Sequence, residues 1–263
     1  MRLSLGISTC PNDTFIFGGM ILNKINHSYN LDVVLDDVEV LNNYAIENKL
    51  DVAKVSYGVV EKVKKNYKIL KAGGALGFGC GPILVSKSFS DVSQLKALKI
   101  GIPGANTTAF KIYKHFFSYL QNEFIEMRFD KIMPAIRDGI IDAGVVIHEG
   151  RFIYDKFGLK KVIDLGDIWE KEYKLPIPLG CILIRNEFIR YAADITEIIR
   201  QSIDYSQNHY EDIFPFIKSY AQELDDEIIN KHIKLFVNEY SYDVSSYIDV
   251  LSKFVNADKN IFV

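Results

Sequence analysis

The repeated alternation of short apolar strands with longer amphipathic segments most constrains this fold. A first series runs along RLSLGIS, FIFGGMILNKI, LDVVLDDV, NNYAIENK and DVAKVS. A second series runs along KIGIPG, TTAFKIYKHFFSYL, EFIEMRF, KIMPAIRDG and DAGVVIH. Strands that alternate with helices build a mainly parallel sheet covered by helices. The chain is therefore predicted to be an α/β protein with two such units.

Two similar junctions stand where one series gives way to the next. Each is a Gly-Cys pair followed by an aliphatic run, at Gly79–Lys87 and at Leu179–Phe188. We expect these strands to cross side by side as a hinge. After the second junction, apolar residues recur at helical spacing to the end of the chain, in ITEIIRQSIDYSQNHY, DDEIINKHIKLF and VSSYIDVLSKFV. The predicted domains are a discontinuous lobe of residues 1–86 plus 185–263 and an inserted lobe of residues 87–184, with a ligand cleft between them.

The charge balance narrows the class of partner. The 263 residues carry a formal net charge of −3, and the basic residues are scattered. Such a chain has no strong field for nucleic acid or an anionic membrane surface, so a small molecule is the expected partner. No apolar run approaches the ~20 residues that span a bilayer, and a strand-like run follows Met1 with no leader before it. We therefore expect a cytoplasmic protein, and the sequence leaves its oligomeric state open.

The cysteine pattern gives no sign of a disulfide framework or a metal site. Cys10, Cys80 and Cys181 are odd in number and form no CxxC motif. We expect them to be small buried thiols. No metal and no cofactor is predicted.

Two segments of the first lobe carry polar residues directly after predicted strands. In STCPNDTF, Ser8–Phe15, a turn enters a helix, and a residue within Asn12–Thr14 is expected either to cap that helix or to contact a ligand. In KVSYG, Lys54–Gly58, Lys54 and Ser56 could offer a ligand a cation and a hydroxyl. The alternative is a solvated lysine and a capping serine.

The segment GIPGANTTAF, Gly101–Phe110, leads from a predicted strand through a glycine loop into a helix that begins near Thr107 and Thr108. The start of a helix favours an anion, because its backbone N–H groups are unpaired and its dipole is positive there. The loop lacks the GxxxxGK[ST] pattern of nucleoside triphosphate sites, so a ligand with a single carboxylate is favoured. Simple capping by threonine is the alternative.

His148 ends the strand-like run DAGVVIH and stands before a Glu-Gly-Arg turn. Loops at the carboxyl ends of strands in α/β sheets line ligand sites. Imidazole exchanges a proton near neutral pH, since its unperturbed pKa is ~6.5. His148 is thus a candidate base, although a structural histidine is the alternative. Glu149 and Arg151 could orient it or bind substrate, or form a surface ion pair.

Five segments in this order and spacing resemble 1,4-dihydroxy-6-naphthoate synthase of the futalosine route to menaquinone. They are GISTCPNDTFIF, DVAKVSYG, GCGPILVS, GIPGANTTA and GVVIHEGRFIY, which span about Gly6 to Tyr154. The resemblance implies a type II periplasmic-binding-protein fold used as a cytoplasmic enzyme. It implies a lyase that converts cyclic dehypoxanthine futalosine into 1,4-dihydroxy-6-naphthoate and releases dihydroxyacetone, without a cofactor.

The resemblance also implies roles for particular residues. His148 would be the proton acceptor, and the stretch Val55, Ser56 and Tyr57, together with Thr107 and Thr108, would hold the carboxylated substrate. A role for Lys54 in stabilising an oxyanion is our own inference from its charge. Two alternatives stay open: a chorismate dehydratase of the same pathway, and a non-catalytic solute-binding module of the same fold, because a fold does not fix a function.

Overall fold

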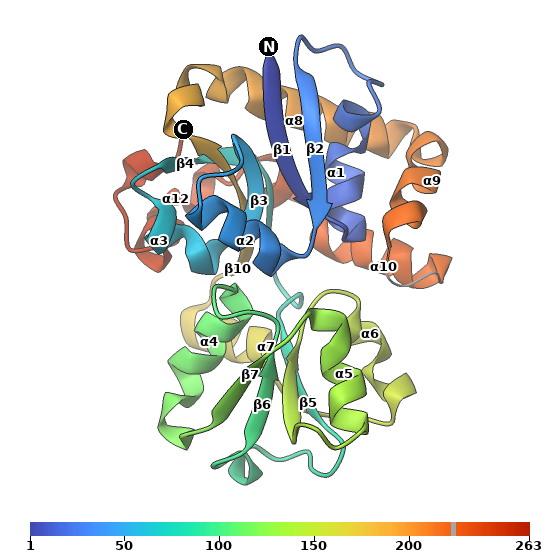
Figure 1. Cartoon of the computed structure of the whole chain (residues 1–263), viewed down its shortest axis with the longest axis vertical. Coiled ribbons are helices and arrows are strands. Elements are labelled where there is room, and N and C mark those ends of the chain that lie inside the picture. Colours follow the sequence, from blue (N-terminus) through green and yellow to red (C-terminus); the bar gives the residue numbers. More distant parts are fainter. Residues whose placement is uncertain (222–224) are drawn as a thin grey trace. The chain divides into compact units, whose positions relative to one another are not determined.

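The computed structural model describes residues 1–221 and 225–263. They form two compact units, each built on its own sheet (Figure 1). The first unit contains Met1–Leu76 and Pro178–Val263, and the second contains Gly77–Ile177. Strands and helices alternate in both, so the predicted α/β class is confirmed. None of the helices within the described ranges is long and apolar enough to cross a membrane.

The strands of the first unit come from both ends of the chain. They are β1 (Arg2–Ser8), β2 (Asn30–Asp36), β3 (Val52–Ser56), β4 (Tyr67–Gly77) and β10 (Ile177–Arg185). Most of its helices follow β10. They are α1 (Pro11–Ile21), α2 (Val38–Ile46), α3 (Val60–Val63), α8 (Ala192–Asn208), α9 (Tyr210–Tyr220), α10 (Asp226–Phe236), α11 (Glu239–Tyr242) and α12 (Ile248–Phe254).

The first sheet has the strand order β2-β1-β3-β10-β4. β1 is parallel to both β2 and β3, whereas β10 is antiparallel to β3. Successive side chains of a strand point to opposite faces, so each strand contributes to two cores. Ala53 and Val55 of β3 join the cluster that packs with α2, while Val52 joins the one that packs with α1 and α8. Lys54, two residues after Val52, therefore faces α1.

The second unit repeats this plan with shorter strands. Its strands are β5 (Ile83–Ser86), β6 (Lys99–Ile102), β7 (Glu123–Glu126), β8 (Ala143–Val146) and β9 (Lys160–Asp164). Its helices are α4 (Thr108–Phe117), α5 (Phe129–Arg137), α6 (Gly150–Ile153) and α7 (Leu165–Tyr173). The strand order is β7-β6-β8-β5-β9. β6 runs parallel to β7 and β8, and β5 runs antiparallel to β8 and β9.

The predicted domain boundaries at 86/87 and 184/185 are wrong by seven to ten residues, since the units change at 76/77 and 177/178. The reason is strand pairing. Ile83–Ser86 pairs with β8 and β9 of the second sheet, whereas Gly180–Ile184 pairs with β3 of the first. The two Gly-Cys segments thus belong to different sheets. That they cross side by side as a hinge stays a prediction.

Candidate functional site

The N-terminus of α1 is not capped by any of the predicted residues. The N-cap residue is Cys10, whose side chain caps nothing, and Pro11 occupies the first helical position. Proline suits that position because its missing N–H would have had no helical partner. The Thr14 hydroxyl bonds the carbonyl oxygens of Cys10 and Pro11, at 3.1 and 3.3 Å. No residue within Asn12–Thr14 caps the helix, and the side chain of Asp13 is left for another partner.

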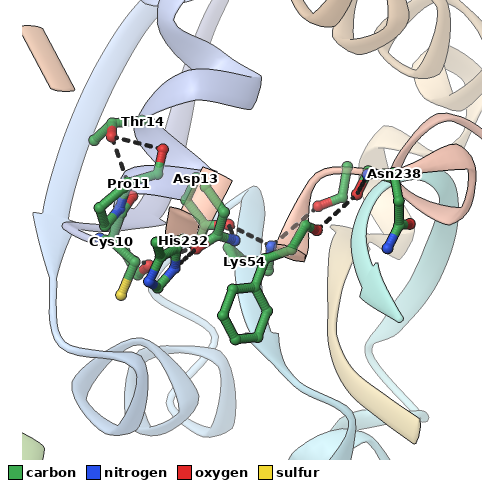
Figure 2. Close-up of polar contacts among 12 residues, drawn as sticks. Cys10, Pro11, Asp13, Thr14, Lys54, His232 and Asn238 are labelled. Atoms are coloured by element: carbon green, nitrogen blue, oxygen red, sulfur yellow. Dashed lines mark hydrogen bonds and ion pairs between the residues drawn. The ribbon is translucent and has the colours of Figure 1, made fainter. Parts of the chain in front are cut away.

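That partner is Lys54, which forms a buried ion pair with Asp13 (Figure 2). The two side chains are only 5% and 3% exposed. Lys54 Nζ also donates to the Gly73 carbonyl oxygen at 3.1 Å. Asp13 accepts two further hydrogen bonds, from Ser8 Oγ at 2.6 Å and from Asn12 Nδ2 at 2.7 Å. Such bonds are needed because taking two charges out of water is costly. The alternative of a solvated Lys54 is wrong.

The network extends to the carboxyl-terminal helices through His232 of α10. This histidine, labelled in Figure 2, is fully buried. Its Nε2 lies 2.9 Å from Asn12 Oδ1. Since the Asn12 amide nitrogen donates to Asp13, its oxygen accepts, so Nε2 of His232 carries the proton. No local sequence pattern indicates this contact, because the two residues lie 220 positions apart.

The residues after Lys54 are buried as well. The side chains of Val55 and Tyr57 pack in the core cluster on the α2 side of the sheet. The Ser56 N–H donates to Asn42 Oδ1 at 2.9 Å, and the Ser56 side chain caps no helix. Burial raises the pKa of the Tyr57 phenol well above its ordinary value. The Tyr57 hydroxyl has no hydrogen-bond partner among the residues that the structure describes, so it could serve a bound molecule.

In the second unit, Thr107 is the N-cap of α4. Its hydroxyl accepts from the Phe110 N–H at 3.3 Å and donates to the Gly104 carbonyl oxygen at 2.8 Å. The capping alternative is therefore correct for Thr107, whose only hydroxyl proton is already engaged. Thr108 is the first helical residue and is 2% exposed. Its backbone N–H belongs to the first turn of the helix, where anions bind.

His148 lies in the turn between β8 and α6, two residues past the end of the strand. Its φ is +56°, a left-handed conformation that is uncommon for residues other than glycine. The ring is half-buried and meets the edge of the Phe129 ring, with 4.9 Å between the centroids. Gly150 closes the turn, because a Cβ there would lie 2.3 Å from Val146 Cγ1. The sequence predicted the position of His148 but not this backbone geometry.

Arg151 ties the same turn to its neighbours. Its guanidinium donates to the Gly81 carbonyl oxygen and pairs with Asp164 at 3.0 Å. Asp164 in turn caps α7 by accepting from the Gly166 N–H at 3.0 Å. Glu149 is 5% exposed. The surface ion pair between Glu149 and Arg151 is therefore wrong, and Arg151 holds the turn that presents His148.

Strand direction brings the candidate residues of each unit to one edge of its sheet. β6 and β8 are parallel neighbours, so the loop that leads to Thr107 and the turn with His148 follow the same edge. β1 and β3 are also parallel neighbours, so Asp13 and Lys54 lie near one edge of the first sheet. The carboxyl edge of a parallel sheet is where α/β proteins bind small molecules. Among residues 1–221 and 225–263, no three His, Cys, Asp or Glu side chains gather as a metal site.

Solved structures with the same architecture define the class of protein. The chain superimposes on a protein from Archaeoglobus fulgidus with a TM-score of 0.90 and 31% identity, covering 97% of this chain and 95% of that one. It superimposes on the periplasmic aliphatic sulphonate binding protein SsuA from Escherichia coli with a TM-score of 0.68 and 9% identity, covering 97% and 85%. The fold is therefore that of the periplasmic binding proteins.

Sequence comparison then places the chain within a family. A family model described as menaquinone biosynthesis matches residues 3–257. A 1,4-dihydroxy-6-naphthoate synthase from Thermus thermophilus is 39% identical over 92% of this chain and 88% of its own length. The enzyme of the same name from Streptomyces coelicolor is 36% identical over 92% and 87%. The chain belongs to the menaquinone biosynthesis family, and the resemblance seen in the five sequence segments is confirmed.

Proposed function

We propose that this protein is a lyase that converts cyclic dehypoxanthine futalosine into 1,4-dihydroxy-6-naphthoate and releases dihydroxyacetone. The relatives that carry this activity in their names match nine tenths of the chain. The proposal places the reaction in the cytoplasm, as the family resemblance implies, and its partner is a carboxylated small molecule. Neither nucleic acid nor a membrane takes part.

His148 is the proposed proton acceptor, and its position is the observation that carries the proposal. It follows a buried strand, takes a left-handed conformation and keeps its ring half-buried. Residues held in such conformations concentrate at functional sites. Removal of a proton beside a substrate carbonyl gives an enolate, and aromatisation of the naphthoate ring drives the reaction forward. One well-placed base contributes ~100- to 10,000-fold to such a step.

The start of α4 is the proposed site for the substrate's carboxylate. Thr107 contributes by fixing the first turn, since its hydroxyl proton is bonded to the Gly104 carbonyl. Thr108 contributes its hydroxyl and its N–H group. Both threonines are 2% exposed, a setting in which a hydrogen bond to a charged group is worth more than it is in water. Because β6 and β8 are neighbours, this turn and His148 follow the same sheet edge.

In the first unit, the stretch from Lys54 to Tyr57 is proposed to bind the substrate. Val55 lies with its side chain in the core, so its contribution comes from the backbone. The Tyr57 hydroxyl, which no described residue bonds, is the natural donor of this stretch. The positive charge of Lys54 is proposed to stabilise an oxyanion of the substrate.

The test is to mix the purified protein with cyclic dehypoxanthine futalosine and to follow the products by mass spectrometry. The naphthoate is expected, and its amount should grow in proportion to the enzyme. Chorismate serves as the second substrate in a parallel reaction. Dehydration of chorismate with no naphthoate from the first substrate would replace the proposal with the sister activity. Tight binding of either compound without turnover would indicate a solute-binding module.

A further inference from the structure

The buried pair of Lys54 and Asp13 has one hydrogen-bond donor to spare. A lysine ammonium carries three N–H donors. Among the described residues, two of those of Lys54 are engaged, one by Asp13 and one by the Gly73 carbonyl. The third can serve a ligand. The absence of a side chain at Gly180 leaves space for the Lys54 side chain, since a Cβ there would lie 2.9 Å from Lys54 Cε.

Asp13 is held more firmly than a simple counterion requires. Ser8 and Asn12 each donate to its carboxylate, and Asn12 is itself fixed by the fully buried His232. These residues come from the end of β1, the start of α1 and the middle of α10. A buried ion pair is a poor source of stability, because desolvation offsets the attraction. A network spread over three elements is better explained by a need to fix the direction of the ammonium.

We infer that Asp13, supported by Asn12 and His232, is a positioning residue for Lys54, and that the third N–H of Lys54 donates to the substrate oxygen that becomes negative when the proton is removed. This inference rests on the proposed function. A preorganised donor of this kind acts on charge that develops in the transition state, so it raises kcat more than it tightens substrate binding. The ammonium keeps its proton throughout, and it lends the oxygen a hydrogen bond.

The decisive variant removes both charges at once. In Lys54→Met with Asp13→Asn, the side chains keep nearly the same shape and no unpaired charge stays in the interior. Replacing a buried pair in this way is often neutral for stability. We expect a parent-like melting temperature, a kcat lower by ~100- to 1,000-fold and a smaller change in KM. A folded double variant with parent-like kcat would overturn the donation to substrate and leave the pair purely structural.

The support from α10 is tested by two replacements of His232. His232→Gln keeps a side-chain N–H that can reach Asn12, and it should turn over like the parent. His232→Leu removes that donor and should lower kcat by up to ~100-fold while KM changes little, since a small displacement of a distant support can have this effect. Equal kcat values for the two folded variants would exclude His232 from the positioning network.

The parent enzyme is assayed together with every variant under the same conditions. If the parent converts cyclic dehypoxanthine futalosine and the double variant matches it, the inference alone fails. If the parent makes no naphthoate, the proposed function fails, and the inference that rests on it fails too. The His115→Asn variant is the matched control, because His115 lies exposed on α4 and, among the described residues, its side chain hydrogen-bonds only the Tyr173 hydroxyl. It should keep the parent kcat.

Discussion

The two units share one plan but hold their polar groups in opposite ways. Each has three neighbouring parallel strands with an antiparallel fourth beside them. In the first unit, the strand ends carry a buried ion pair with several hydrogen bonds. In the second, they carry the half-buried His148 in a left-handed backbone conformation. The same sheet edge thus carries a buried ion pair in one unit and a histidine with a left-handed backbone conformation in the other.

A hydrogen-bond donor and a base have different structural needs. A donor that stabilises developing charge must not move when the charge appears, so it belongs in a rigid setting. A base must give and take a proton, so it is better half-buried than locked away. Holding a residue in a rarely populated conformation costs ~1–3 kcal/mol, and the surrounding structure has to bear that cost. Arg151 and Asp164 form an ion pair next to this turn.

The largest effect is expected for His148→Asn. Asparagine tolerates the left-handed conformation, so the turn should survive while the base is lost. Turnover should fall by ~100- to 10,000-fold with substrate affinity nearly unchanged. Steady-state kinetics and equilibrium binding measure the two quantities separately. The His209→Asn control changes an exposed histidine of the first unit that stacks on Tyr205, and it should behave like the parent. Parent-like turnover in His148→Asn would leave the second unit without its base.

The next effect concerns stability and the first unit. Asp13→Asn leaves the Lys54 ammonium buried without its counterion, so the free energy of unfolding should drop by ~3–5 kcal/mol. The matched control is Asp32→Asn, which breaks the surface pair with Arg2, whose side chains are 77% and 58% exposed. That change should stay within ~1 kcal/mol. Urea unfolding measures both. Similar small losses in the two variants would mean that the buried pair is not tightly coupled to the fold.

A smaller effect separates the two threonines of the second unit. Thr107→Val removes a helix cap and should lower the free energy of unfolding by ~0.5–2 kcal/mol. Thr108→Val leaves the cap intact and should instead weaken substrate binding by ~1.5–3 kcal/mol, the worth of one hydrogen bond to a charged group. Thermal unfolding and calorimetric binding are measured on both. The reverse pattern would move the carboxylate contact from Thr108 to Thr107.

The smallest effect is one that the two units should share. All three cysteines are buried, as predicted, and burial raises the pKa of the Cys80 thiol from 9.0 to about 12. Below pH 9 the folded and unfolded states both keep this proton. Between pH 9 and 12 only the unfolded state releases it, so stability declines as the pH rises.

The Cys80→Ala variant should therefore lose less stability than the parent between pH 8 and pH 10. Burial raises the pKa of Cys181 in the first unit in the same direction, so Cys181→Ala should show a similar difference. Melting curves at the two pH values are sufficient. Curves that shift equally in all three proteins would indicate that these thiols ionise readily in the fold.

Local pattern predicted much of each sheet. The run RLSLGIS is β1 to the residue, and the runs at β3 and β6 agree within one or two residues, because alternation and branched side chains are read directly from neighbouring positions. β4 and β9 were missed, although they belong to the two sheets. The domain boundaries failed for a non-local reason, since the pairing partner of β5 decides its unit.

In the candidate site, too, local features could be predicted from the sequence and long-range contacts could not. His148 and Thr107 follow strands closely, so the sequence could predict them. The partner of Asp13 is 41 positions away and that of Asn12 is 220 positions away, and no local pattern encodes such contacts. The missing cap on α1 was the available signal: a helix that starts with Pro11 leaves Asp13 available for another role.

The most direct test of the account is the stoichiometry of the products from the parent enzyme. Proton NMR follows cyclic dehypoxanthine futalosine, the naphthoate and dihydroxyacetone together in one sample. Naphthoate and dihydroxyacetone should appear in equal amounts, at equal rates, as the substrate disappears without any added cofactor. Consumption of substrate that yields no dihydroxyacetone, or no consumption by the folded protein, would contradict it.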